Sequence, residues 1–121
     1  MANILIVDDS STMRKIISRS LRQAGLAVDD IFEAGDGIEG LAVLSSGKKV
    51  DLILSDINMP NMDGLEFIKS VRANGNTVPV VMITTEGGEE IIKEAMDSGA
   101  SGSIKKPFTP DQLQEKLGGL L

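Results

Sequence analysis

Six polar or charged residues directly follow short apolar segments of this chain, and their types suit one kind of chemistry. They are Asp8, Asp9, Asp56, Thr84, Lys105 and Lys106. Three carboxylates brought together repel one another, and a divalent cation on oxygen ligands, as Mg²⁺ prefers, removes that repulsion. A phosphoryl group fits between such a cation and a lysine ammonium, with a hydroxyl on a further oxygen. The residue types therefore indicate a site for a phosphoryl group and Mg²⁺.

A carboxylate is the expected nucleophile of such a site, because the chain contains no His and no Cys and acyl phosphates form on Asp side chains. Asp56 is the best candidate, since its segment is expected at the centre of the sheet, between the acid pair and Thr84. Support of the next helix through its dipole would account for one of Asp8 and Asp9, but it leaves Asp56 unexplained.

The two lysines need to be separated. Lys105 and Lys106 point to opposite faces if both belong to a strand, so only one can reach the site. The apolar periodicity does not choose between them. The other is expected to be solvated or to lie over a helix.

The composition excludes several other classes of function. The 121 residues fit one domain, 1–121. The lack of Cys and His excludes disulfides, thiolate metal sites and Ser-His-Asp catalysis. A net charge of −6 and 2% aromatic residues argue against nucleic-acid binding and flavin stacking. No apolar run approaches the roughly 20 residues of a membrane span, and no signal-peptide pattern is present, so we expect a cytoplasmic protein without membrane insertion.

Five short apolar segments alternate with five helix patterns, which predicts five strands that are each followed by a helix. The expected strands cover residues 3–7, 28–32, 52–54, 80–83 and 103–105. The last helix has the clearest start, with Thr109 as N-cap, Pro110 in the first turn and Gln112 at the capping-box position. Its expected buried stripe consists of Leu113, Leu117 and Leu120.

This alternation predicts an α/β fold. Right-handed crossovers place helices on both faces of a doubly wound, five-stranded parallel (βα)5 sheet, with the flavodoxin-like order 2-1-3-4-5. Binding sites in such sheets form at the carboxyl ends of the strands, where the candidate residues stand. The turn-rich residues 58–64 after Asp56 either simply reverse the chain or supply a backbone carbonyl to the cation and a flexible lip around the site.

Together these motifs resemble the receiver domain of two-component response regulators, and most of all the CheY-like single-domain type. The matching segments are Val-Asp-Asp-Ser at 7–10, Asp56 with Asn-Met-Pro-Asn-Met-Asp-Gly at 58–64, Thr84 after Val-Met-Ile at 81–83, and Lys-Pro-Phe-Thr at 106–109. The resemblance covers essentially the whole chain, so we expect a receiver domain without an output domain. It implies a signalling phosphoacceptor that catalyses only its own phosphorylation and dephosphorylation, in chemotaxis or a phosphorelay.

The resemblance also implies how the acidic residues divide their roles. Asp56 would accept the phosphoryl group. Asp9, Asp56 and the backbone carbonyl of Asn58 would bind Mg²⁺, and Asp8 would contribute through water or by shaping the field.

The remaining implied roles concern the response to the phosphoryl group. Lys106 would pair with it, and Thr84 would donate a hydrogen bond to it and move on activation. Asn58 and Glu86 occupy family positions that tune its lifetime. The usual Tyr or Phe of the switch is replaced by Ser103, so an aromatic ring that turns inward as Thr84 moves cannot transmit the signal here.

The implied partners are proteins. The donor would be a sensor histidine kinase or a phosphotransfer protein, and a downstream target would bind the surface built from the fourth helix, the fifth strand and the fifth helix. Because the chain has no His, the donor phosphohistidine has to lie on another protein.

Two other functions share parts of this pattern. A flavodoxin-like FMN carrier has the same strand order, and the hydroxyls at 10–12 resemble a phosphate loop, but the two carboxylates before them would repel the FMN phosphate. A small phosphatase with an Asp nucleophile would carry two acids spaced by one residue after the first strand, whereas Asp8 and Asp9 are adjacent.

Overall fold

Ten elements alternate strictly between strand and helix in the computed structural model, which describes residues 2–84 and 89–120. In chain order they are β1 (Ala2–Val7), α1 (Ser11–Gln23), β2 (Val28–Ala34), α2 (Gly37–Ser45), β3 (Leu52–Asp56), α3 (Gly64–Ala73), β4 (Val80–Thr84), α4 (Glu89–Asp97), β5 (Gly102–Lys105) and α5 (Pro110–Leu117). The predicted alternation is confirmed. The strands are longer than the apolar segments because they continue into polar residues, as at Asp56 and Thr84.

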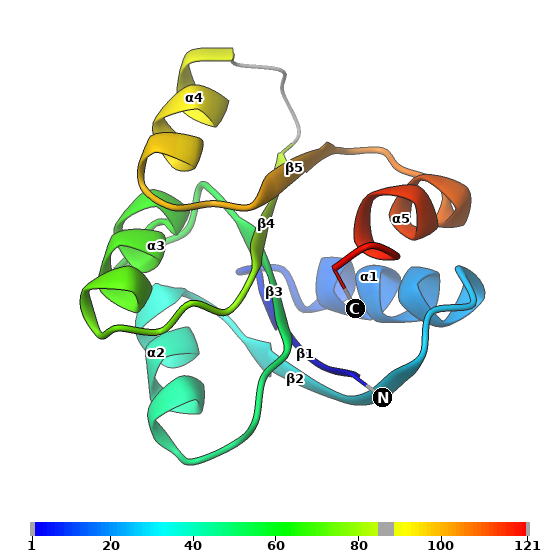
Figure 1. Cartoon of the computed structure of the whole chain (residues 1–121), viewed down its shortest axis with the longest axis horizontal. Helices are drawn as coiled ribbons and strands as arrows, with labels where there is room; N and C mark the ends of the chain where they lie inside the picture. The colour runs from blue at the N-terminus through cyan, green and yellow to red at the C-terminus, as the bar shows by residue number, and fades with distance from the viewer. Residues whose placement is uncertain (1, 85–88, 121) are drawn as a thin grey trace.

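The five strands form one parallel sheet in the order β2-β1-β3-β4-β5. This is the predicted flavodoxin-like order. In Figure 1, α1 and α5 lie together on one side of the sheet, and α2, α3 and α4 lie on the other. With β3 at the centre, Asp56 lies between the end of β1 and the end of β4, as expected.

The core has two halves because both faces of the sheet are covered. Along β1, Leu5 and Val7 belong to the half beneath α2, α3 and α4, whereas Ile4 and Ile6 belong to the half beneath α1 and α5. All four side chains have no exposed surface. Such two-sided burial explains why β1 is a continuous apolar run rather than an alternating one. Packing on both faces of the sheet positions the carboxyl ends of the central strands.

The predicted start of the last helix is confirmed, but the predicted end of its buried stripe is not. The Thr109 capping box is present, with Gln112 N donating to Thr109 Oγ1 and Thr109 N donating to Gln112 Oε1. Leu113 and Leu117 are buried, but the prediction for Leu120 is wrong, since its side chain is 37% exposed. The reason is that α5 ends at Leu117, so Leu120 is no longer in phase with the stripe. None of the described helices is long and apolar enough to cross a membrane.

Candidate functional site

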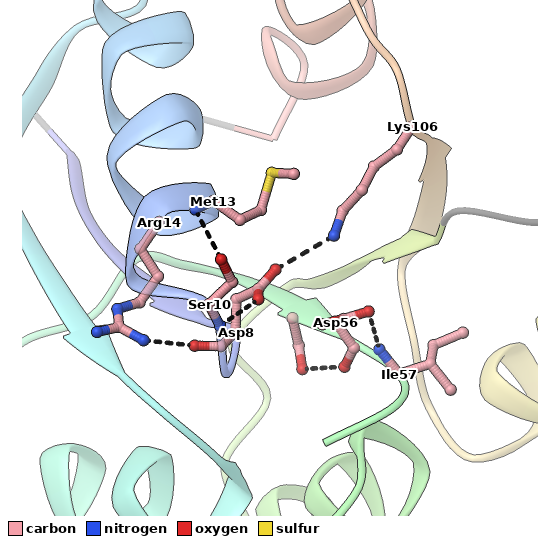
Figure 2. A network of polar contacts seen from close by, with 8 residues as sticks. Asp8, Ser10, Met13, Arg14, Asp56, Ile57 and Lys106 are labelled. Carbon is pink, nitrogen blue, oxygen red and sulfur yellow. Dashed lines mark hydrogen bonds and ion pairs between the residues drawn. The ribbon is translucent and has the colours of Figure 1, made fainter. Parts of the chain in front are cut away.

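The carboxyl ends of the strands bring the predicted side chains to one edge of the sheet. Asp8 and Asp9 follow β1, Asp56 is the last residue of β3, and Lys106 follows β5. Figure 2 shows the side chain of Lys106 extending from the end of β5 toward Asp8, with Asp56 beside them. The expected convergence of separate strand ends is therefore present.

Asp8, Asp9 and Asp56 form an acid cluster in which one carboxylate oxygen from each residue lies within 4.8 Å of the others. The three differ in exposure: Asp8 is buried, Asp56 is half-buried and Asp9 is exposed. The cluster is thus open on the side of Asp9 and closed on the side of Asp8. Three oxygen donors at this separation, with an open side for water, suit a hard divalent cation.

Asp56 has an environment that opposes its negative charge. Burial is the largest cause that raises the pKa of its carboxyl group, and the charges of Asp8 and Asp9 raise it further. The ammonium of Lys106 and a hydrogen bond from Ile57 N to Asp56 Oδ1 (2.8 Å) act in the other direction but do not outweigh the burial. A cation at the acid cluster would stabilise the ionised carboxylate of Asp56 against burial and against the charges of Asp8 and Asp9.

Lys106 is the lysine that reaches the site. Its Nζ lies 3.2 Å from Asp8 Oδ2, and both side chains are nearly inaccessible to solvent. The backbone fixes this direction, because Lys106 N donates to the carbonyl of Thr84 at the end of β4. Lys105 is exposed. The structure thus decides between the two lysines in favour of Lys106.

Asp8 is held by the start of α1. Its Oδ1 accepts a hydrogen bond from Ser10 N (2.9 Å), and its carbonyl accepts one from the Arg14 guanidinium (2.6 Å). Arg14 also forms an ion pair with Glu33 of β2 (2.9 Å). Arg14 was not among the predicted site residues, because nothing in the apolar pattern distinguishes a guanidinium that turns back to the end of β1 from one in solvent.

The hydroxyl run at 10–12 serves the helix start. Ser10 is the N-cap of α1, and its Oγ accepts a hydrogen bond from Met13 N (3.2 Å). Ser11 and Thr12 already belong to α1. This segment therefore opens a helix beside an acid cluster, which is unsuitable for binding a phosphate of FMN.

The second half of the loop after Asp56 is tied to its surroundings by hydrogen bonds. Asn61 has a left-handed backbone (φ 65°), and its Nδ2 donates to Asp36 Oδ2 at 2.9 Å. Gly37 N donates to the carbonyl of Met62 (3.1 Å), and Gly64 N donates to the carbonyl of Ile57 (2.7 Å). These bonds tie Asn61 and Met62 to the start of α2, and Gly64 to Ile57; the flexibility of the lip stays a prediction.

Asp36 was also missed. It is 6% exposed and caps α2 by accepting from Glu39 N. Hydrogen bonds from the Asn61 side chain, and then from the Glu39 backbone, lower the pKa of the Asp36 carboxyl group. An Asp followed two residues later by an apolar residue and then Glu does indicate a helix start, but the bond to Asn61 joins segments 25 residues apart, which no local pattern reveals.

The other predicted residues lie around this edge. Thr84 ends β4 and is buried, Ser103 lies half-buried in β5, and the side chain of Asn58 is exposed in the loop after β3. Glu86 lies outside the described residues.

Comparison with known proteins points to one family. The family model "Response regulator receiver domain" matches residues 4–118. A chemotaxis protein CheY homolog of Campylobacter jejuni is 44% identical over 120 residues, which cover 98% of this chain and 91% of that protein. Chemotaxis protein CheY1 of Helicobacter pylori strain J99 is 43% identical over 116 residues, 94% of this chain and 92% of that protein.

Solved structures agree. The chemotaxis response regulator CheY4 of Vibrio cholerae superposes with a TM-score of 0.86 at 40% identity, covering 100% of this chain and 99% of that one. A CheY-like receiver domain protein from Methanospirillum hungatei gives a TM-score of 0.84 at 28% identity, over 98% and 92% of the two chains.

Proposed function

This chain belongs to the response regulator receiver domain family, and on that premise we propose that Asp56 accepts a phosphoryl group from the phosphohistidine of a partner protein. Receiver domains are signalling phosphoacceptors rather than metabolic enzymes, and histidine kinases are their donors. The single observation that carries the assignment to Asp56 is its place: it alone of the acid cluster ends the central strand, within reach of both acid neighbours and Lys106.

The transfer is a substitution at phosphorus. A carboxylate oxygen of Asp56 forms the new bond to phosphorus, and the bond from phosphorus to the donor imidazole nitrogen breaks with its electron pair left on that nitrogen. Because Asp56 enters as the ionised carboxylate, no base has to remove a proton from it. Hydrolysis of the acyl phosphate by water then returns the carboxylate and releases inorganic phosphate.

The acid cluster suits Mg²⁺, which Asp9, Asp56 and the backbone carbonyl of Asn58 would hold, with Asp8 contributing through water or by shaping the field. When bound, the ion neutralises charge so that an anionic phosphoryl group can approach an anionic carboxylate. Lys106 is placed to contribute a second positive charge. Its ammonium contacts the Asp8 carboxylate, and it could also bind the oxygens of a phosphoryl group on Asp56. Thr84 would supply a hydroxyl, and Asn58 and Glu86 would tune the lifetime of the acyl phosphate.

The output is a changed protein-binding surface built from α4, β5 and α5. On α4, Ile91 and Met96 are 42% and 44% exposed. Single exposed apolar side chains are ordinary on protein surfaces, so the resemblance to the family carries the assignment of this surface. The chemotaxis relatives favour a place in chemotaxis over another phosphorelay, with residues 1–121 acting as one receiver domain in the cytoplasm.

Labelling with a small phosphodonor tests the assignment. Acetyl phosphate and Mg²⁺ should label the wild-type chain at one site per molecule, and Asp56→Asn should abolish the label. Asp97→Asn at the exposed end of α4 is the control and should label fully. Full labelling of Asp56→Asn would move the acceptor to another residue.

A further inference from the structure

Asp36 is a buried carboxylate outside the acid cluster, and both of its oxygens are engaged. Oδ1 accepts from Glu39 N (2.8 Å) and thereby caps α2, while Oδ2 accepts from Asn61 Nδ2 (2.9 Å). Only the first of these bonds serves the helix. The second crosses to the loop that follows the phosphoacceptor strand.

That second bond fixes the part of the loop with the least common backbone. Asn61 has φ 65°, a left-handed conformation that residues other than Gly adopt only at a cost. The adjacent Met62 is held by Gly37, whose N–H donates to the Met62 carbonyl (3.1 Å). A Cβ added to Gly37 would lie 2.6 Å from Met62 Cγ, so α2 and the loop approach each other as closely as a glycine permits.

We propose that Asp36 is a positioning residue for the phosphoacceptor site, acting through Asn61 to hold the backbone between Asp56 and α3 where the carbonyl of Asn58 can bind a divalent cation. The inference rests on the proposed function, because it takes the acid cluster and Asn58 as the cation site. Asn58 lies only three residues before Asn61. Release of Asn61 would therefore free the carbonyl while leaving the three carboxylates in place, since two of them directly follow β1 and the third ends β3.

Asp63 provides a built-in comparison. The sequence Asp-Gly-Ile-Glu at 36–39 recurs as Asp-Gly-Leu-Glu at 63–66, and Asp63 caps α3 through Glu66 N (2.9 Å) just as Asp36 caps α2. Within the described residues, the Asp63 carboxylate shows no second bond comparable to that between Asp36 and Asn61. The same substitution at both sites thus separates the bridge from the cap.

The test uses Ser at both caps, because Ser remains a good N-cap but is too short to reach Asn61. Mg²⁺ affinity of the unphosphorylated chain is measured by calorimetric titration. We expect about tenfold weaker binding for Asp36→Ser, the low end of the effect of outer-shell residues on metal affinity. Asp63→Ser removes the same charge from the cap of the next helix, at the end of the loop that carries Asn58, and should bind within about twofold of wild type by the same reasoning.

Asn61→Gly gives a second, uncharged way to break the bridge. Gly tolerates the left-handed backbone, so this variant keeps the loop's allowed conformation and loses only the hydrogen bond. It should weaken Mg²⁺ binding as Asp36→Ser does, and the double variant should be no weaker than either single variant, as expected for one shared contact. Saturating Mg²⁺ should restore most of the rate of labelling by acetyl phosphate, since the acceptor itself is unchanged.

Asp9→Asn separates failure of this inference from failure of the site on which it rests. If Asp9→Asn weakens Mg²⁺ binding but Asp36→Ser and Asn61→Gly bind like Asp63→Ser, the site stands and the positioning role is refuted. If Asp9→Asn binds Mg²⁺ as the wild type does, the proposed cation site itself is wrong, and the positioning role falls with it.

Discussion

The ammonium of Lys106 lies 3.2 Å from Oδ2 of Asp8, although the two residues are 98 positions apart in the chain. Their side chains are 10% and 3% exposed. This ion pair joins the end of β5 to the end of β1 across the acceptor strand. Asp8 is consequently the carboxylate whose charge is already compensated, while Asp56 keeps a raised pKa.

Replacement of Lys106 by Met should destabilise the metal-free protein and strengthen its binding of Mg²⁺. The free energy of unfolding should fall by about 3 kcal/mol, because a buried carboxylate loses its partner. A cation at the acid cluster then takes over part of that compensation, so Mg²⁺ binds more tightly. Urea denaturation with and without Mg²⁺ measures both effects. Lys105→Met is the control, since Lys105 is exposed; equal effects of the two variants would contradict the assignment.

Asp56→Asn should stabilise the metal-free protein at pH 7. The pKa of Asp56 is raised in the folded state above its ordinary value of 3.8, so the ionised carboxylate costs stability above the folded-state pKa. That cost disappears as the pH falls through the raised pKa and below 3.8, where the wild-type side chain is protonated in both states. The advantage of Asp56→Asn should therefore shrink in acid.

Thermal unfolding of both proteins from pH 7 to pH 4 in a chelator checks this. Saturating Mg²⁺ should reverse the order of stability, because the wild type binds the ion with one more carboxylate. An Asp56→Asn variant that is less stable than wild type at pH 7 without metal would show that attraction to Lys106 outweighs burial and repulsion.

The chain order alone was enough to predict the sheet and most of its site. Asp56 and Thr84 follow apolar runs, and a parallel sheet brings the carboxyl ends of such runs to one edge whatever the side chains are. The apolar alternation could not choose between Lys105 and Lys106, because it says that two neighbours differ in direction but not which one faces the site. The family resemblance pointed to Lys106. In the structure, the register of β5 beside β4 and the contact between Lys106 and Asp8 place Lys106 at the site.

Contacts between loops could not be predicted for a different physical reason. The bond between Asp36 and Asn61 joins two connections whose approach depends on how α2 packs on α3, and hydrogen-bonding residues in loops look alike in a sequence. Exposure at the ends of helices had the same limit. Whether Leu120 is buried depends on where α5 stops, and helix ends are set by capping and tertiary contacts as much as by the apolar stripe.

Arg72→Met should destabilise the fold without changing the site. From α3, the Arg72 guanidinium donates to the carbonyls of Asn76 and Val78 before β4 and to that of Gly99 after α4. Met keeps much of the apolar stem but leaves these carbonyls without a donor, so we expect a loss of about 2 kcal/mol.

The matched control for Arg72 is Arg19→Met on the exposed face of α1, which should change stability by less than about 0.5 kcal/mol. Chemical denaturation gives both values. The rate of labelling by acetyl phosphate should stay within about twofold of wild type for both variants, because Arg72 contacts the opposite ends of the strands. Equal stability of the two variants would show that water replaces the guanidinium at these carbonyls.

Ser103→Tyr should change the output of the switch and leave phosphorylation alone. Ser103 is half-buried in β5 and borders a groove of about 320 Å³ lined also by Gln112, Glu115 and Lys116. A serine cannot fill this space, so the surface between β5 and α5 stays open where the family usually has an aromatic ring. Tyrosine should occupy the groove in one state of Thr84 and leave it in the other.

The affinity ratio of the phosphorylated and unphosphorylated forms for a downstream protein should then change, whereas Ser103→Ala, which adds nothing to the groove, should keep the wild-type ratio. Amide chemical shifts of α4, β5 and α5 before and after phosphorylation give the same comparison without a partner.

Because Ser103 does not belong to the acid cluster, the rates of labelling by acetyl phosphate and of label loss should match wild type in both variants. Altered rates together with unchanged binding and unchanged shifts would place Ser103 in the phosphorylation site rather than on the path to the output surface.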